Sequence, residues 1–342
     1  DEKRQGREPR ILFYLSEGQD DEKAFEKEVA NHFSMLDLVV LCLSGNQLRE
    51  AVAETQALKR VEINRQELNS DPVAKRELED RLTAAEQTQA GLLQSLINSP
   101  AVNKWFHEGR NRNVGTKRNL QKLMSEVLKS AFHKAPVIRN ELINRDIPSA
   151  QANAGRNKLL LAMLRNESEE DLSIDKFPPE KSMYRSVLKA TGIHIQQDNG
   201  DWTFVEPVSD RRKQTKLVRE SNILPAWQKI DEFLESTATQ AKSFDDLREV
   251  LTAPPYGLKA GILPILYIAA YSVYHNELAL YENRLFKAGF TEEMLQRFAK
   301  RPDEFTFQRF RLEGLKASIF EQYGKVPQLI GRGQKTTLLS LA

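Results

Sequence analysis

The first 46 residues alternate between continuous apolar runs and one polar stretch. The run ILFYL starts at Ile11 and the run LDLVVLCL at Leu36, and the residues between about Asp20 and His32 are polar with a helical period. Continuous apolar runs are typical of strands buried on both faces of a parallel sheet, whose connections need a crossover helix. Residues 1–46 are therefore predicted to form a partial α/β unit, a βαβ arrangement that resembles part of a nucleotide-binding core.

Residues 47–131 are predicted to be a charged helical region. Their apolar positions recur with a helical period, and Asp71 followed by Pro72 is a typical helix start, because Asp caps the first turn and Pro suits its first position. We predict one helix that ends near Arg65 and a longer one from Pro72 to Ile97. A third, amphipathic helix is expected over 119–132, with apolar residues at i, i+3 and i+4 spacing.

A basic stretch over residues 104–118 precedes this third helix, and we predict that it is a loop. It places Trp105 and Phe106 beside several cations. Two interpretations stay open. The cations contact nucleic-acid phosphates while an aromatic ring stacks on a base, or the aromatic residues anchor the loop to the core while the cations stay in water. The candidate nucleic-acid residues of this stretch are Arg110, Arg112, Lys117 and Arg118.

Residues 132–207 are predicted to form a helical lid followed by a winged-helix-like module. Pro136 can begin a helix that runs through Asn144, and Ser149 can cap the next one. A short helix over about 180–190 then precedes two strand-like runs around Asn199–Gly200. Asn-Gly between such runs is a strong signal for a hairpin with a type I′ turn. A helix followed by a hairpin forms the back half of a winged helix-turn-helix.

Residues 208–342 repeat this order, so we predict a second winged-helix-like helical module. The pair Pro254–Pro255 precedes a strongly apolar helix from about Lys259 to Tyr274, and the string LALYENRLFK then predicts a hairpin. A helix with apolar side chains on nearly every face must be buried. The predicted fold class is mainly α with small β hairpins, with the partial α/β unit at the N-terminus.

Composition limits the function classes. The 342 residues carry a net charge of +2, which favours neither a nucleic-acid-binding protein nor an enzyme of acidic substrates. Cys42 is the single cysteine and lies in an apolar run, so we expect a buried thiol, no disulfide and no cysteine-based zinc site. We see no signal peptide and no apolar run of about 18 residues, so we expect a cytoplasmic protein. Neither end resembles a natural terminus, so we expect a fragment of a larger protein.

No stretch of the sequence spells out a catalytic site. The phosphate-binding pattern GxxxxGK[ST] does not occur, and the histidines lack the spacing of a metal site. Glu17 and Asn46 follow the two predicted strands, where polar residues of a P-loop ATPase would face the nucleotide. The alternative is that both belong to ordinary strand-to-loop connections. We therefore expect no catalytic residue and no bound cofactor in this fragment alone.

Three strings carry a family resemblance: FHKAPVIRNELINRDIPSAQANAGRNKLL, FPPEKSMYRSVLKATGIH and LTAPPYGLKAGILPILYIAAY. They resemble the region beyond the nucleotide-binding core of large bacterial P-loop ATPases of anti-phage defence, such as the BREX-system ATPases, over roughly residues 70–340. The resemblance implies an AAA+ or STAND-like machine that uses ATP and Mg²⁺ in the intact parent protein. It also implies self-assembly and contacts with the rest of its own ATPase chain, with other defence proteins and with DNA.

The resemblance also singles out particular residues. By position, Arg156 resembles the lid arginine that such ATPases direct at nucleotide phosphates, and a helix-surface salt bridge is the alternative. A shared polar motif without an assigned reaction is matched by Asn140, Glu141, Asn144 and Arg145.

Two function hypotheses follow. The first is a non-catalytic regulatory and assembly portion of a defence-associated ATPase, whose winged-helix modules pack on the ATPase core and contact partners. The second is a winged-helix DNA-binding protein that uses the 181–189 helix, because Lys181, Arg185 and Lys189 share one face at i, i+4 and i+8 spacing. The acidic wing QQDNGD argues against phosphate contacts. A complete small-molecule enzyme would need a nucleophile–base pair or a metal site, and the sequence displays neither.

Overall fold

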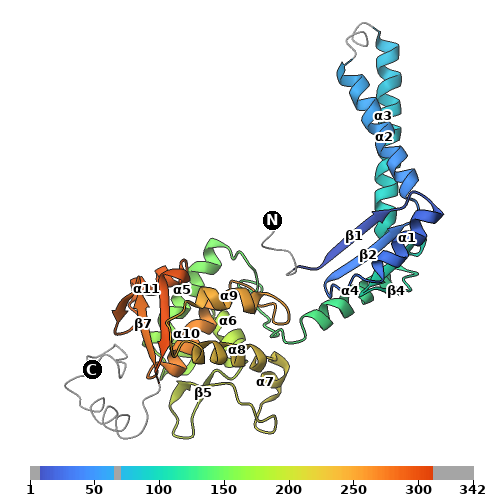
Figure 1. The fold of residues 1–342 in the computed structure, drawn as a ribbon. Coiled ribbons are helices and arrows are strands. Elements are labelled where there is room, and N and C mark those ends of the chain that lie inside the picture. Colours follow the sequence, from blue (N-terminus) through green and yellow to red (C-terminus); the bar gives the residue numbers. More distant parts are fainter. Residues whose placement is uncertain (1–7, 65–70, 311–342) are drawn as a thin grey trace. The chain divides into compact units, whose positions relative to one another are not determined.

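The computed structural model describes residues 8–64 and 71–310 of the chain. They divide into two compact units, Asp1–Ala131 and Phe132–Ala342, which are treated separately below (Figure 1). The described residues are mainly α-helical with small sheets, which confirms the prediction of a mainly α fold with small β elements. The described part of the chain contains no helix with the length and apolarity needed to span a membrane.

The first unit is built on one sheet with the strand order β1-β2-β3-β4. β1 and β2 are parallel, and α1 connects them, so the predicted βαβ unit is confirmed. The expectation that both strands are buried is wrong for β1, because it lies at the edge of the sheet and has no buried residue. Every residue of β2 is buried, as its continuous apolar run predicts, and the Cys42 thiol is among them. The elements of this sheet are β1 (Arg10–Leu15), α1 (Gln19–Val29), β2 (Asp37–Cys42), β3 (Asn103–His107) and β4 (Arg110–Arg112).

The loop predicted around residues 104–118 is wrong, because its first half is the β3–β4 hairpin. His107 pairs with Arg110, and Glu108 and Gly109 between them both have positive φ, the geometry of a type I′ turn. Trp105 is fully buried and its indole N–H donates to the Pro100 carbonyl at 2.9 Å. Phe106 is buried as well, so the aromatic residues anchor this segment to the core.

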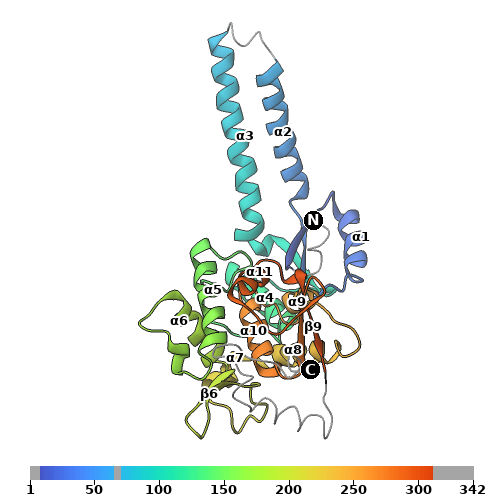
Figure 2. The ribbon, with the colours of Figure 1, turned by 90° about the vertical axis from the view of Figure 1, so that its left-hand side faces the viewer.

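Two long helices follow β2 and precede β3 in the chain, and they extend side by side away from the sheet (Figures 1 and 2). They are α2 (Gly45–Asn64) and α3 (Pro72–Asn98), which confirms the predicted pair of helices. The Asp71 carboxylate accepts hydrogen bonds from the backbone N–H groups of Val73 and Ala74, as expected of a helix cap. The amphipathic helix α4 (Lys117–Ala131) completes the unit.

The second unit surrounds one apolar helix, α10 (Leu263–Tyr274). Ten of its twelve residues are buried, which confirms that it is buried on nearly every face. Its neighbours include α5, and the Tyr267 ring stacks on Phe244 with centroids 4.4 Å apart. The other helices are α5 (Ala150–Arg165), α6 (Pro179–Tyr184), a π-helical turn (Arg185–Lys189), α7 (Lys216–Ser221), α8 (Leu224–Glu235), α9 (Phe244–Thr252) and α11 (Glu292–Phe298).

Both predicted hairpins are present in this unit. β5 (His194–Gln196) pairs with β6 (Trp202–Phe204), and β7 (Leu278–Glu282) pairs with β8 (Leu285–Lys287). The expected type I′ turn at Asn199–Gly200 is wrong, because only Gly200 has positive φ and the loop spans five residues. Asn283 and Arg284 both have positive φ and form the tight turn between β7 and β8. A third strand that the sequence did not predict, β9 (Phe305–Arg309), pairs with the other side of β7.

The helix predicted over 136–144 is also wrong, because this segment consists of extended residues and turns. The Asn140 side chain accepts a hydrogen bond from the backbone N–H of Leu142, and the Asn140 carbonyl accepts one from Asn144. Asn often competes with helical hydrogen bonds in this way. The segment is nevertheless fixed, because Ile143 is fully buried.

We predict that Leu266→Ala lowers the free energy of unfolding by about 2–5 kcal/mol, because Leu266 is fully buried in α10 and its truncation leaves a cavity. Leu217→Ala is the matched control, since Leu217 is 63% exposed on α7. Urea unfolding of both variants measures the difference. Equal stabilities of the two variants would show that α10 is not at the centre of this core.

Candidate functional site

The two residues expected near a nucleotide, Glu17 and Asn46, lie side by side after β1 and β2. The Asn46 amide donates to the Glu17 carbonyl at 2.9 Å, and Arg49 forms an ion pair with the Glu17 carboxylate at 2.9 Å. Arg49 also donates to the Ser16 carbonyl at 2.7 Å. Gly45 permits this approach, because a Cβ there would lie 2.6 Å from the Ser16 backbone. The polar groups at these strand ends thus bind one another.

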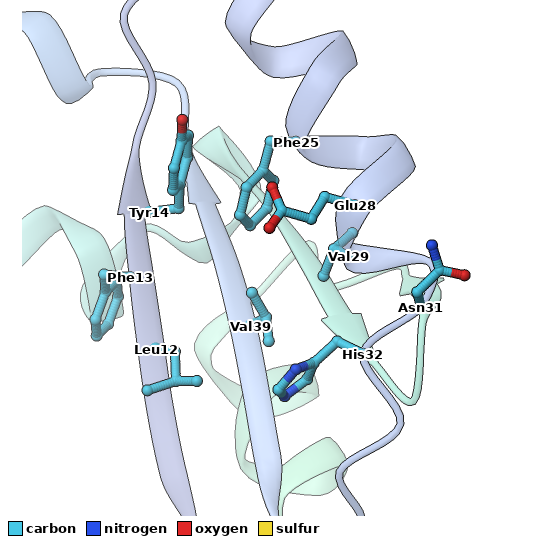
Figure 3. Close-up of a pocket in the computed structure, with 9 residues that line it drawn as sticks. All are labelled: Leu12, Phe13, Tyr14, Phe25, Glu28, Val29, Asn31, His32 and Val39. Atoms are coloured by element: carbon cyan, nitrogen blue, oxygen red, sulfur yellow. The ribbon is translucent and has the colours of Figure 1, made fainter.

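A pocket of about 480 Å³ lies between α1 and the strands β1 and β2 of the same sheet (Figure 3). Its apolar lining includes Val29 and Val39 together with Tyr14 and Phe25, whose rings stack with centroids 4.1 Å apart. Glu28, Asn31 and His32 provide polar groups around this lining. Such a surface suits an apolar group with a polar edge.

His32 at this pocket is oriented by Asp37 of β2. The His32 Nε2 lies 3.1 Å from the Asp37 carboxylate, which also receives two hydrogen bonds from the Arg10 guanidinium at 2.8 and 2.9 Å. Burial raises the pKa of Asp37, but these hydrogen bonds outweigh it and lower the pKa below its usual value. The carboxylate is therefore a charged support for both neighbours. Within residues 8–64 and 71–310 no group of three or more His, Cys, Asp and Glu side chains could hold a metal ion.

The candidate nucleic-acid cations of the first unit do not form one free patch. Arg112 forms an ion pair with Glu126 at 3.2 Å, and the Lys117 ammonium donates to the Asn98 side chain at 3.1 Å. Arg110 and Arg118 are exposed at the turn and on α4.

The cations of the second unit converge on one carboxylate. Asp171 lies 2.7 Å from the Lys189 ammonium, 3.3 Å from that of Lys181 and 3.4 Å from the Arg185 guanidinium. Burial raises the pKa of Asp171, but its hydrogen bonds with Lys189 and Lys181 prevail and lower the pKa overall. The structure thus places the three residues together, as their spacing predicts, and partly neutralises them.

The polar motif carries structural contacts. The buried Asn140 amide donates to the Ser182 and Ser186 hydroxyls at 3.2 and 3.0 Å, and so holds α6. Asn144 donates to the Ile138 carbonyl at 3.4 Å. The Arg145 carbonyl accepts from the Gly261 N–H at 2.9 Å, and Glu141 is exposed. These positions fasten the segment before α5 to the rest of the unit.

Arg156 belongs to the second unit, so its distance from Glu17 and Asn46 is not defined. Its side chain is buried and its Nη1 donates to the Gly261 carbonyl at 3.3 Å. Nε has no hydrogen-bond partner among the described residues. Burial lowers the pKa of Arg156. The alternative of a helix-surface salt bridge is wrong, because the side chain is not on the surface.

Sequence reasoning missed a buried polar chain formed by Tyr184, His194 and Glu167. The His194 Nε2 donates to the Glu167 carbonyl at 2.7 Å, and the Nδ1 therefore accepts from the Tyr184 hydroxyl at 2.9 Å. Burial lowers the pKa of His194 to about 4. No spacing signal marks this group, because its members come from three separate segments.

Comparison with known proteins gives no relative. No family model, no curated protein and no solved structure matches this chain.

We predict that acid weakens the second unit through His194. Since its pKa is about 4 when folded and about 6.5 when unfolded, the unfolded chain binds more protons between these values. The contribution of neutral His194 to the free energy of unfolding is fully present above pH 6.5. It is lost as the pH drops toward 4, by up to about 3 kcal/mol, at 1.36 kcal/mol per pKa unit. Urea unfolding across this range measures the slope. In His194→Gln, which keeps a polar side chain but cannot titrate, the slope should be smaller; an unchanged slope would contradict the assignment.

Proposed function

We propose that this chain is a regulatory and assembly portion of a large defence-associated ATPase, and that the α2–α3 hairpin is the arm with which it contacts another protein. The observation that carries the proposal is that this hairpin extends away from its own sheet (Figures 1 and 2). At 1.5 Å per residue, its 20 and 27 residues correspond to lengths of about 30 and 40 Å.

The hairpin buries few residues, and Leu48 and Leu96 at its base belong to the core of the sheet. Only seven of its residues are buried, and Lys59 and Glu86 join the two helices by an ion pair of 2.7 Å. The buried residues are Gly45, Leu48, Ala51, Thr55, Leu78, Ala85 and Leu96. Helices of this length gain most of their stability from packing, so an arm with few buried positions leaves much surface for a partner.

Charge and exposed apolar groups favour a protein partner over nucleic acid. The two helices carry six basic and seven acidic residues, a net charge of −1, whereas nucleic-acid surfaces are strongly basic. Near the outer ends of the helices, Ile63 is 79% exposed and Val73 is 78% exposed. These two side chains are available for apolar contact with a protein partner.

The assignment to a defence ATPase and the winged-helix-like modules are supported by the sequence and by the order of the elements, not by the α2–α3 hairpin. The three sequence strings support an anti-phage ATPase parent that uses ATP and Mg²⁺, self-assembles and acts with other defence proteins. The order of a helix followed by a hairpin, in α6 with β5–β6 and in α10 with β7–β8, supports winged-helix-like modules. DNA binding through residues 181–189 has less support, because Asp171 already binds the three cations.

We predict that the double variant Ile63→Asp and Val73→Asp weakens assembly of the full-length protein at least about tenfold, because an Asp at an interface core must lose its hydration. Sedimentation velocity over a concentration series, with and without ATP, measures the association constant. The variant should unfold at the same temperature as the unmodified protein, since both positions are exposed.

Leu217→Asp is the matched control, because it places the same charge at an exposed apolar position on α7. It should leave assembly unchanged. Assembly that is unaffected by the double variant, or weakened equally by the control, would exclude the hairpin as the assembly arm.

A further inference from the structure

A second cavity, of about 220 Å³, lies within the second unit beside the N-terminal ends of α5 and α10. Its lining combines apolar side chains with polar and charged ones. The positively charged ones are Arg156, Arg248 and Lys300, and the single acidic one is Asp146. Asp146 is bound to the Lys259 ammonium at 2.8 Å, so its charge is already compensated. Arg248 is likewise paired, with Asp245 at 3.5 Å, so the positive charge without an ion pair among the described residues is that of Arg156 and Lys300.

Arg156 is the unusual member of this lining. It is only 7% exposed, and the one hydrogen bond of its side chain, to the Gly261 carbonyl, is long at 3.3 Å. Its Nε has no partner and, among the described residues, its side chain forms no ion pair. A buried guanidinium is normally paired with a carboxylate or another anion, because burial of an unpaired charge is costly.

Tyr267 supplies a second unused donor to the same cavity. The residue is 2% exposed and its hydroxyl has no hydrogen-bond partner within the described chain. Its ring is fixed by stacking on Phe244, so the hydroxyl cannot easily turn toward solvent. Two buried side chains with unpaired donors, one of them charged, thus line one small cavity.

We propose that this cavity binds a phosphate-type oxyanion, with Arg156 as the charged donor and Tyr267 as the neutral one. An oxyanion offers several acceptor lone pairs and compensates the guanidinium charge, and Arg is the side chain best matched to phosphate. Lys300 adds positive charge at the same cavity, whereas the charge of Arg248 is compensated by Asp245. This site is independent of the proposed role of the α2–α3 hairpin.

The size of the cavity limits the ligand. About 220 Å³ lies below the range of 300–1,000 Å³ that is typical of sites for drug-sized ligands. The cavity suits a single phosphoryl group, supplied either as free phosphate or as the end of a larger phosphorylated molecule whose remainder lies outside.

Isothermal titration calorimetry on the 342-residue chain tests the proposal, with inorganic phosphate titrated at constant ionic strength set by chloride. We expect saturable binding that Arg156→Met weakens at least about tenfold, because a charge-assisted hydrogen bond is lost. Tyr267→Phe should weaken binding several-fold. Arg211→Met is the matched control, since Arg211 is exposed, and should bind phosphate like the unmodified chain.

Thermal unfolding without phosphate separates a ligand-binding role from a structural one. Arg156→Met should unfold at the same or a higher temperature than the unmodified chain, because Met removes an uncompensated buried charge. A lower unfolding temperature would show that Arg156 stabilises the fold by itself, and would overturn the proposal. Phosphate binding that is absent, or equal in Arg156→Met, would also overturn it.

Two further titrations identify the source of the phosphoryl group. ATP that binds more tightly than phosphate, with the same loss in Arg156→Met, assigns the site to a nucleotide phosphate. Phosphate binding without ATP binding assigns it to the free anion. Acetate that binds as tightly as phosphate would contradict a phosphoryl ligand.

Discussion

Burial of α10 is the interaction on which the second unit depends. Side chains from separate parts of the unit form one apolar cluster with this helix, including Met183, Trp227 and Phe244. Its N-terminal end is held as well, because the Gly261 N–H binds the Arg145 carbonyl at 2.9 Å. A Cβ at Gly261 would lie 2.3 Å from the Ile143 carbonyl, so only glycine permits this close approach. α5 packs on α10, and the cavity lined by Arg156 lies beside the N-terminal ends of these two helices.

In the first unit, by contrast, the longest helices are not buried in the core. Its core lies against a sheet in which β2 is buried along its whole length, whereas α2 and α3 leave that core and pack mainly on each other. Two helices that depend on their mutual contact hold their outer ends weakly. An arm of this kind can adapt to a partner, while the sheet that carries it stays rigid. This contrast between a fixed core and an exposed arm underlies the proposed assembly function.

The sequence predicted the elements whose signal is local. The apolar run of β2, the Asp71 cap and the apolar sequence of α10 each indicate their environment within a few consecutive residues, whereas the equally apolar run of β1 forms an edge strand without a buried residue. Prediction from the sequence failed where contacts between residues that are distant in the sequence determine the local structure. Residues 136–144 have a helical pattern but are drawn into turns by Asn140, and β9 exists because β7 offers it an edge.

The candidate sites show the same limit. Spacing alone placed Lys181, Arg185 and Lys189 on one face, but no pattern could indicate that Asp171 lies among them. Arg156 was singled out by position, whereas its burial and its unpaired Nε depend on the packing of α5 against α10. Tyr267 carried no sequence signal at all, because an apolar helix conceals a single hydroxyl.

Native-state hydrogen exchange tests the central claim, that a fixed core around α10 coexists with a weakly held α2–α3 arm. Amides of α10 should exchange only through global unfolding of the second unit, with the same free energy as urea unfolding reports. Amides in the outer halves of α2 and α3 should exchange through local opening at far lower free energy. Equal protection of the outer arm and of α10 would contradict the account, because the hairpin would then be part of a core rather than a surface available to a partner.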